Sequence, residues 1–261
     1  MNQSLIIRED RDGVASLTMN SPDNLNALSE AMMAALKAAL EDIAGDGDVR
    51  AVTLTGAGRA FCAGHDLKEI AAAREGAADG GRAFFNHLFA ACSTLMMEIM
   101  RLPKPVIALP RGVAAAAGCQ LVATCDLAIA AEGTKFGVNG VNIGLFCSTP
   151  MVALSRVMPR KKVMEMLLTG AFIEADEARA AGLVNAVVPG AELAGAGFEM
   201  AGTIAGKLDK VVAIGKEAFY AQAELPLAAA YEYTADIMAE NLMMRETEAA
   251  IDAFLNKPRL N

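Results

Sequence analysis

The sequence contains no tryptophan, two histidines and three tyrosines among 261 residues, and its 23 Lys and Arg are outnumbered by 31 Asp and Glu. The resulting net charge of −8 excludes the basic surface that nucleic-acid binding requires. No uninterrupted apolar run reaches the roughly 20 residues that cross a bilayer, so we expect no membrane insertion. Because 54% of the residues are hydrophobic, the chain can bury a large core, either as one α/β domain or as a domain with a helical extension.

Disulfide, metal and targeting signals are also missing. The cysteines are odd in number and scattered through mostly apolar segments, which predicts buried reduced thiols; they are Cys62, Cys92, Cys119, Cys125 and Cys147. The two histidines, His65 and His87, form no recognised metal-ligand spacing with Cys62, so we expect no metal site. The N-terminus lacks the features of a signal or transit peptide, and we therefore expect a cytoplasmic protein.

Apolar periodicity predicts strands that alternate with helices, followed by helices alone. The expected strands cover residues 5–8, 14–19, 51–55, 106–109, 127–130 and 184–188, and the expected helices cover residues 30–43, 82–101, 159–168, 174–181 and most of 191–255. Ser29 is the expected N-cap of the first helix, and Ser148 or Thr149 that of a helix after a packed loop at 135–150. Residues 71–81 lack periodicity and predict a mobile segment.

The alternation of strands and helices predicts an α/β core over residues 1–195 and a helical C-terminal region over residues 196–261.

Two familiar catalytic patterns are incomplete or missing. Residues 56–61 begin like a dinucleotide-binding fingerprint, but the sixth position is Phe61 rather than Gly, and no helix starts on the second glycine. No G-x-S-x-G motif occurs, which argues against a serine hydrolase of the α/β type. A Rossmann site and a serine nucleophile are therefore not expected.

Two turns built from small residues stand out, Ala63-Gly64-His65 and Ala116-Ala117-Gly118, each following a strand and preceding a helix. Two backbone N–H donors from such turns can form an oxyanion hole, in which each donor stabilises a transition state by roughly 3–4 kcal/mol. Close packing of helix against strand explains the small residues equally well. The residues alone do not decide between these alternatives.

Several short segments, in order and over nearly the whole chain, resemble the crotonase (enoyl-CoA hydratase/isomerase) superfamily. They are residues 24–28, 61–67, 105–108, 118–121, 125–128 and 182–184, with a closer resemblance to one branch of the family over 118–123 and 140–150. The resemblance implies an α/β fold, a spiral of ββα units with a C-terminal α-helical trimerisation region, assembled as a homo-trimer or a dimer of trimers. It also implies acyl-CoA thioesters as ligands and a role in fatty acid metabolism, with coenzyme A as part of the substrate and no separate cofactor.

The resemblance also implies roles for individual residues. The backbone N–H groups of His65 and Ala117 would hold the thioester carbonyl as it becomes enolate-like. The substrate-binding positions carried over from the family are Ala27, Ala63, Asp66, Leu67, Ala116 and Leu145. Within the family, this assignment favours the oxyanion hole over simple packing.

Both catalytic glutamates of the hydratases are replaced, by Gln120 and Gly140. Gln120 can orient a water by hydrogen bonds but cannot take its proton, and Gly140 offers no side chain. A positioned acid or base typically contributes about 10²–10⁴-fold to such a reaction. We therefore expect an enoyl-CoA hydratase-like lyase by family in which ordinary hydration is weak or absent, and isomerisation likewise.

Three alternatives remain open at this point. The first is another enolate-stabilising reaction of an acyl-CoA, a decarboxylation or thioester hydrolysis, in which the His65 imidazole takes part as in methylmalonyl-CoA decarboxylase-like members. The second is a nucleophilic Cys147, which needs a nearby base to form a thiolate. The third is a catalytically silent acyl-CoA-binding scaffold. We favour a role for the His65 backbone alone, and packing as the role of Cys147.

Overall fold

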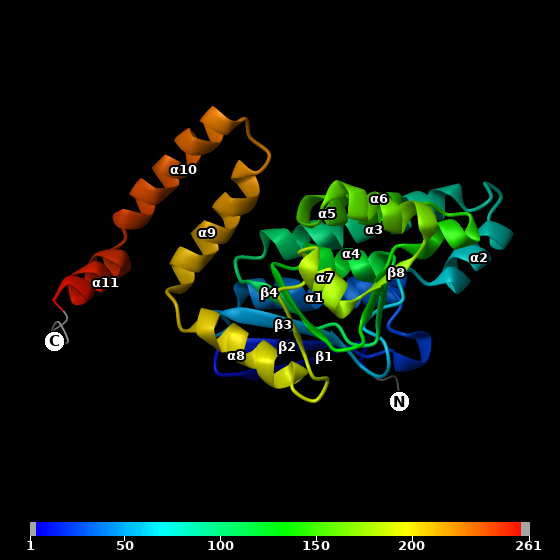
Figure 1. The fold of residues 1–261 in the computed structure, drawn as a ribbon, viewed down its shortest axis with the longest axis horizontal. Helices are drawn as coiled ribbons and strands as arrows, with labels where there is room; N and C mark the ends of the chain where they lie inside the picture. The colour runs from blue at the N-terminus through cyan, green and yellow to red at the C-terminus, as the bar shows by residue number, and fades with distance from the viewer. Residues whose placement is uncertain (1–3, 257–261) are drawn as a thin grey trace.

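The computed structural model describes residues 4–256, and it is built on two β-sheets (Figure 1). The larger sheet has the order β1-β2-β3-β4-β6-β9, with strands Ile6–Arg11, Val14–Met19, Ala51–Gly56, Val106–Ala108, Leu127–Ala131 and Ala186–Val188. β1 and β2 form an antiparallel hairpin, and every other neighbouring pair in this sheet is parallel. The smaller sheet has the order β5-β7-β8, with strands Val113–Ala115, Lys135–Gly137 and Phe172–Glu174.

The hairpin and the parallel strands follow from their residues. Asp12 and Gly13 both have positive φ, 51° and 78°, which is the backbone of a two-residue hairpin turn whose twist matches that of the strands. β3 is buried over almost its whole length, because a parallel sheet is covered on both faces. The strands predicted at the start of the chain are therefore confirmed.

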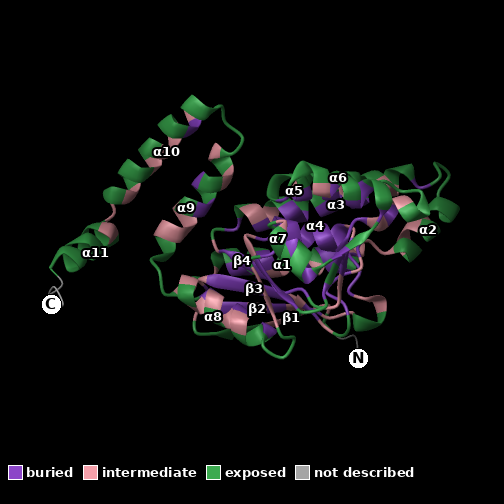
Figure 2. Cartoon of the chain, in the orientation of Figure 1, coloured by how far each residue is buried: buried purple, intermediate pink, exposed green. Residues whose placement is uncertain are grey.

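Helices cover both faces of the larger sheet. On one side pack α1 (Glu30–Gly45), α3 (Arg82–Arg101) and α4 (Ala117–Thr124), and over α4 lies α5 (Ser148–Val157). On the other side α8 (Leu193–Ala205) packs on β2, β3 and β6 (Figure 1). Figure 2 shows the buried residues gathered in these layers. By length and composition alone α3 could span a membrane, but one of its faces packs into the core.

The remaining elements complete the body and an arm. They are η1 (Pro22–Asn24), α2 (Leu67–Gly76), η2 (Asn139–Ile143), α6 (Arg160–Thr169), α7 (Ala175–Ala180), α9 (Asp209–Gln222), α10 (Leu227–Leu242) and α11 (Arg245–Leu255). The last three form an arm that reaches away from the body and is mostly exposed (Figures 1 and 2). The predicted succession of C-terminal helices is confirmed. The predicted boundary at residue 195 lies within α8, which itself packs on the sheet, and it stays a prediction.

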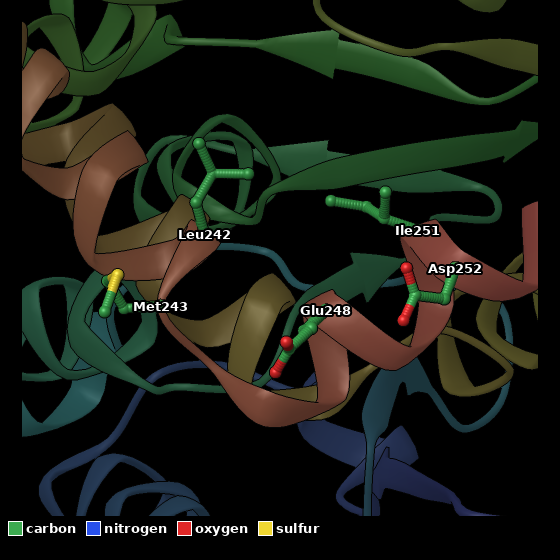
Figure 3. A pocket seen from close by; sticks show the side chains of 5 residues that line it. All are labelled: Leu242, Met243, Glu248, Ile251 and Asp252. Atoms are coloured by element: carbon green, nitrogen blue, oxygen red, sulfur yellow. The ribbon is translucent and has the colours of Figure 1, made fainter. Parts of the chain in front are cut away.

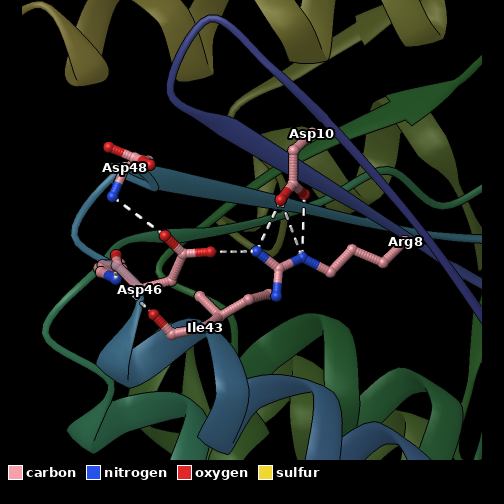
Figure 4. Close-up of polar contacts among 6 residues, drawn as sticks. Arg8, Asp10, Ile43, Asp46 and Asp48 are labelled. Carbon is pink, nitrogen blue, oxygen red and sulfur yellow. Dashed lines mark hydrogen bonds and ion pairs between the residues drawn. The ribbon is translucent and has the colours of Figure 1, made fainter.

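A polar cluster ties β1 to the end of α1 (Figure 4). Arg8 donates to both carboxylate oxygens of Asp10 and, through Nη2, to Asp46 Oδ2 at 2.5 Å. Asp46 is the C-cap residue of α1, and its other oxygen accepts from the backbone N–H of Asp48 at 3.0 Å. The Arg8 guanidinium lowers the pKa of Asp46, and this cluster fixes the sheet edge against α1.

Several expectations need correction. Residues 71–76, predicted to be mobile, belong to α2, an exposed helix with no buried side chain and hence no apolar periodicity to detect. The segment at 135–150, predicted to be a loop, contains the strand β7 and the 3-10 helix η2. The strands β7 and β8 were not predicted, because three residues are too few to show alternation. The helix at 148 begins after Cys147, which makes no side-chain cap bond; Ser148 and Thr149 lie inside it. The Ser29 cap is confirmed, since its Oγ accepts from Met32 N at 3.1 Å.

Candidate active site

The first small-residue turn is fastened to the loop of residues 24–28 by backbone hydrogen bonds. Ala63 N donates to Leu25 O at 3.0 Å, and Leu28 N donates to Gly64 O at 2.7 Å. Leu25 itself has a φ of 51°, a left-handed conformation that non-glycine residues adopt at a cost and that aims its carbonyl at the turn. The turn that carries His65 is therefore held by two separate residues of one loop.

Asp66 fixes the far side of this turn and begins α2. Its Oδ1 accepts from Lys68 N at 2.8 Å, and its Oδ2 accepts from Asn24 Nδ2 at 2.7 Å. Burial acts to raise the pKa of Asp66, but the hydrogen bonds from Asn24 and Lys68 outweigh it and hold that pKa below its usual value. Asp66 is thus an ionised N-cap that locks the turn to the 24–28 loop.

The second turn joins β5 to α4 through a strained residue. Ala115 N donates to Cys62 O at 2.9 Å, and Ala116 N donates to Gly137 O at 2.8 Å. Between these anchors and the helix, Ala116 adopts φ 48° and ψ −116°, a conformation that a residue with a Cβ rarely adopts. Such strain costs on the order of 1–3 kcal/mol and persists only where the surrounding structure imposes it, commonly at functional sites.

The two turns touch at positions where only glycine fits. A Cβ on Gly64, whose φ is +96°, would lie 3.0 Å from Ala116 Cβ and 3.4 Å from Ala117 N. A Cβ on Gly118 would lie 2.3 Å from Cys62 O. The residue before His65 therefore packs directly against the backbone nitrogen of Ala117.

The backbone N–H groups of His65 and Ala117 are both free of protein partners. Within residues 4–256, neither N–H donates a hydrogen bond to another protein group. Ala117 is the first residue of α4, where unpaired N–H groups and the positive end of the helix dipole favour a negative charge. Two such donors on touching turns can hold a carbonyl oxygen that gains negative charge. The predicted pair of donors thus lies on turns that the structure brings together.

The His65 side chain is neutral and packed. Its Nδ1 lies 3.3 Å from Leu28 O, so Nδ1 carries the hydrogen, and its ring meets Phe89 edge-on at a centroid distance of 5.5 Å. Its Nε2 is buried without a hydrogen-bond partner among the described residues. Burial lowers the pKa of His65 below 6.5. These contacts orient the residue whose backbone N–H faces the site.

This burial predicts a pH dependence of stability. Below about pH 6.5 the unfolded chain protonates His65 while the folded chain resists, so the unfolded state binds more protons and stability decreases as the pH is lowered. The fall in Tm from about pH 7.5 to about pH 5.5 should be smaller in His65→Asn, whose amide can still donate to Leu28 O.

The other histidine provides the matched control. His87 is exposed, and His87→Asn leaves the buried His65 imidazole in place, so this variant should keep a fall in Tm like that of the wild type. Equal falls in wild type and His65→Asn would show that folding does not disfavour the His65 imidazolium.

One helical turn beyond Ala117, Gln120 lines a cavity of about 1000 Å³. Positions three apart lie on the same side of a helix, so Ala117 and Gln120 face one way. The cavity is partly open to solvent and lies between α3, α4, α5 and α9, and its walls include Met96, Met97, Met100, Val152, Ala213 and Ile214. Charged side chains at its edge come from Arg101, Arg156, Lys210, Glu217 and Glu224. Among the residues predicted for the site, only Gln120 lines this cavity.

Helix α9 is attached to the body by a buried polar network. Lys216 Nζ donates to Asp126 Oδ2 at 2.6 Å and to the carbonyl of Ile99 at 2.9 Å, and Tyr220 OH donates to Asp126 Oδ1 at 2.8 Å. Asp126 also accepts from Val106 N at 2.7 Å. Burial lowers the pKa of Lys216, and Asp126 opposes that shift. One carboxylate thus joins the cavity wall on α9 to β4 and to the chain that follows α4.

At Gly140, the second position where the hydratases have a glutamate, neighbouring atoms leave no space for a side chain. A Cβ on Gly140 would lie 2.2 Å from Leu145 O and 2.9 Å from Cys147 Sγ. Cys147 is buried, which raises the pKa of its thiol and disfavours the thiolate that a nucleophile needs. Leu145 is 45% exposed on the same loop. The structure therefore agrees with packing as the role of Cys147.

The remaining predicted substrate-binding residues surround the two turns. Ala27 is buried, Ala63 is half-buried and Leu67 is 54% exposed at the start of α2. None of them lines the cavity described above, and their contact with coenzyme A stays a prediction. The residues that the sequence did not single out are the cavity walls. The close spacing of Met96, Met97 and Met100 was the available signal, whereas nothing in the sequence placed α9 beside α3.

A smaller hollow of about 250 Å³ lies on the arm, between α10 and α11 (Figure 3). Leu242, Met243, Glu248, Ile251 and Asp252 line it, and Figure 1 places these helices away from the two turns. Among residues 4–256, no group of three or more His, Cys, Asp or Glu side chains is positioned to hold a metal ion. The two touching turns and the adjoining cavity are thus the candidate site.

Comparisons with known proteins agree with this arrangement. A family model for enoyl-CoA hydratase/isomerase matches residues 9–261. Enoyl-CoA hydratase domain-containing protein 3, mitochondrial, from Homo sapiens is 43% identical over 246 residues, which are 94% of this chain and 79% of the human protein. The crystal structure of that human protein has a TM-score of 0.91 at 41% identity, covering 98% of this chain and 100% of the other. An enoyl-CoA hydratase structure from Mycobacterium smegmatis has a TM-score of 0.92 at 47% identity, covering 99% of each chain. The predicted fold class is confirmed.

One expectation from the sequence is contradicted by these relatives. The human, rat and mouse proteins are all named as mitochondrial, which overturns the cytoplasmic compartment that we inferred. The inference rested on missing targeting features in the N-terminal residues, and such an absence does not establish a compartment.

Proposed function

Because the chain belongs to the enoyl-CoA hydratase/isomerase family, we propose that it binds an acyl-CoA thioester and polarises its carbonyl through the N–H groups of His65 and Ala117. One observation carries this proposal: both N–H groups lack a hydrogen-bond partner among the described residues, and they lie on turns that touch each other. The strained Ala116, which directs the chain into α4, supports it further. The acyl group would extend past Gln120 into the methionine-walled cavity.

We further infer that hydration of an enoyl group by this site is weak or absent. Gln120 cannot take a proton from water, and Gly140 has no room for a side chain. The carboxylates that do line the cavity, Glu217 and Glu224, are both exposed on or beside α9 rather than on α4. We expect the site to stabilise an enolate although neither position 120 nor position 140, where the hydratases have glutamates, carries a carboxylate.

A second reaction is favoured by the same geometry. Loss of CO₂ from a malonyl-type CoA leaves an enolate, which two N–H donors stabilise and which takes its proton from water. This reaction needs no base, in contrast to hydration. Thioester hydrolysis through Cys147 is disfavoured, because burial raises the pKa of that thiol.

Crotonyl-CoA provides the test. We expect it to raise the Tm of the protein while the enoyl absorbance decays slowly or not at all. Turnover at rates typical of hydratases would contradict the weak-hydration part, and absence of any acyl-CoA binding would contradict the whole proposal. Release of CO₂ from a malonyl-type CoA would identify the second reaction, and binding without turnover of any acyl-CoA would favour a silent acyl-CoA-binding scaffold.

We also propose assembly as a homo-trimer or a dimer of trimers through the arm. Helices α9–α11 expose large apolar side chains, among them Phe219, Leu227, Tyr231, Met238, Met243, Phe254 and Leu255. Large apolar side chains that are exposed in such number on neighbouring helices commonly mark an interface. Light scattering on the purified protein should give the mass of three or six chains, and the mass of one chain would contradict this assembly.

A further inference from the structure

The direction of the His65 N–H depends on the carbonyl of the residue before it. The Gly64 carbonyl and the His65 N–H belong to one planar trans peptide group, so they point in opposite directions. Leu28 N donates to that carbonyl at 2.7 Å, and Leu28 pairs with His65 as a parallel β-bridge. The position of Leu28 therefore decides where the His65 N–H points.

Helix α2 begins two residues after His65, but packing contributes little to its position. None of the side chains of α2, all of which the structure describes, is buried. Ile70 is partly buried and packs against the core. A helix with so little apolar contact needs polar bonds to keep the preceding turn in place.

Glu69 ties α2 to the start of α1. Its Oε2 accepts from the backbone N–H of Glu30, the first residue of α1, at 3.1 Å. An N–H at this position has no acceptor within its own helix, and the positive end of the helix dipole favours a carboxylate there. Glu30 follows Leu28 by two residues. The contact thus holds the same short segment whose N–H binds the Gly64 carbonyl.

The surroundings of Glu69 make a carboxylate costly at this place. Burial raises the pKa of Glu69, and the carboxylates of Asp66 and Glu30 raise it further, against the hydrogen bond from Glu30 N. His87 on α3 lies on the other side of Glu30, at 3.3 Å. Because the folded state raises this pKa, ionisation of Glu69 lowers the stability of the folded protein at neutral pH. A neutral side chain with the same oxygen would serve stability better, which indicates a role for Glu69 beyond stability.

We propose that Glu69 is a positioning residue of the oxyanion hole: it holds the start of α1, keeps the Leu28 N–H on the Gly64 carbonyl and thereby aims the N–H of His65 at the thioester. This inference rests on the proposed acyl-CoA binding and adds a residue that acts through the backbone rather than on the substrate. A carboxylate or a carboxamide oxygen satisfies this geometry, whereas alanine leaves the first N–H of α1 unpaired.

Infrared difference spectra of bound octanoyl-CoA, labelled with ¹³C at the thioester carbon, test this role. In Glu69→Ala the shift of the carbonyl to lower frequency should fall to about half or less of the wild-type shift, because one of two donors loses its alignment. Octanoyl-CoA should also bind about 3- to 10-fold more weakly, as one weakened hydrogen bond predicts. Glu69→Gln keeps an acceptor oxygen and should show the wild-type shift and affinity, with a Tm at or above that of the wild type.

Glu75→Ala is the matched control, because Glu75 is an exposed carboxylate on the same helix, and it should keep the wild-type shift. A melting curve for each variant establishes that it is folded. A full wild-type shift in Glu69→Ala would overturn the inference, and so would a shift in Glu69→Gln as small as that in Glu69→Ala. Failure of the proposed function is distinct from both: the wild type itself would then bind no octanoyl-CoA, or bind it without any shift.

Discussion

Replacing Lys216 by methionine should lower the free energy of unfolding by about 3–5 kcal/mol, because it leaves the buried Asp126 carboxylate without its charged partner. The Lys216 side chain is 6% exposed and that of Asp126 is 14% exposed, with 2.6 Å between Nζ and Oδ2. Tyr220 and the Val106 N–H would remain as partners of Asp126, but neither carries a positive charge. Urea unfolding measures the change.

The same helix supplies the control for this prediction. Lys210 pairs with Glu246 at 2.7 Å, but both side chains are about half exposed, so Lys210→Met should change stability by at most about 1 kcal/mol. The double variant Asp126→Asn/Lys216→Met should be more stable than Lys216→Met, because it removes the unpaired charge while keeping an acceptor. If Lys216→Met and Lys210→Met cost the same, the buried network does not hold α9 to the body.

Substituting Gly118 by alanine should destabilise the protein by about 1–3 kcal/mol, against the intrinsic preference of a helix for alanine. The added Cβ would lie 2.3 Å from Cys62 O and 2.8 Å from Cys62 Cβ, so the two turns must move apart. That movement separates the N–H donors of His65 and Ala117. Gly118→Ala should therefore weaken acyl-CoA binding as well as folding.

For a second helical glycine we expect the opposite effect of alanine on stability. Gly215 lies in the interior of α9, and apart from the adjacent backbone of its own helix no atom lies within 4 Å of a Cβ built there. Gly215→Ala should stabilise the helix by about 0.5–1 kcal/mol, as alanine does at exposed helical positions. Chemical unfolding of both variants measures the two signs. Stabilisation by Gly118→Ala would show that the turns do not touch as described.

The sequence alone predicted the elements that are determined by residues close together in the chain. The β1–β2 hairpin, the Ser29 cap and the helix at 82–101 depend on local turn chemistry and apolar spacing, and all three are confirmed. α2 shows the limit of this reasoning: its side chains are not buried, so its sequence carries no periodicity. The strands of the smaller sheet are three residues long and exist because of their neighbours.

The site depends still more on long-range contacts. Almost every residue has a backbone N–H, so the amino-acid sequence does not show which of these groups form a site. The resemblance to the family, rather than any spacing, identified His65 and Ala117. The strain at Ala116 and the closure of Gly140 by Leu145 O arise from segments that meet only in the folded chain. The wall formed by α9 is positioned by Asp126, ninety residues before Lys216. These features require the three-dimensional structure.

The most direct test of the account is the carbonyl stretching frequency of a bound acyl-CoA labelled with ¹³C at the thioester carbon, measured by isotope-edited infrared difference spectroscopy. Two N–H donors that polarise the carbonyl weaken its double bond. The bound thioester should therefore absorb at lower frequency than the free one, and Gly118→Ala should reduce this shift. A bound thioester with the frequency of the free ligand would contradict an oxyanion hole formed by His65 and Ala117.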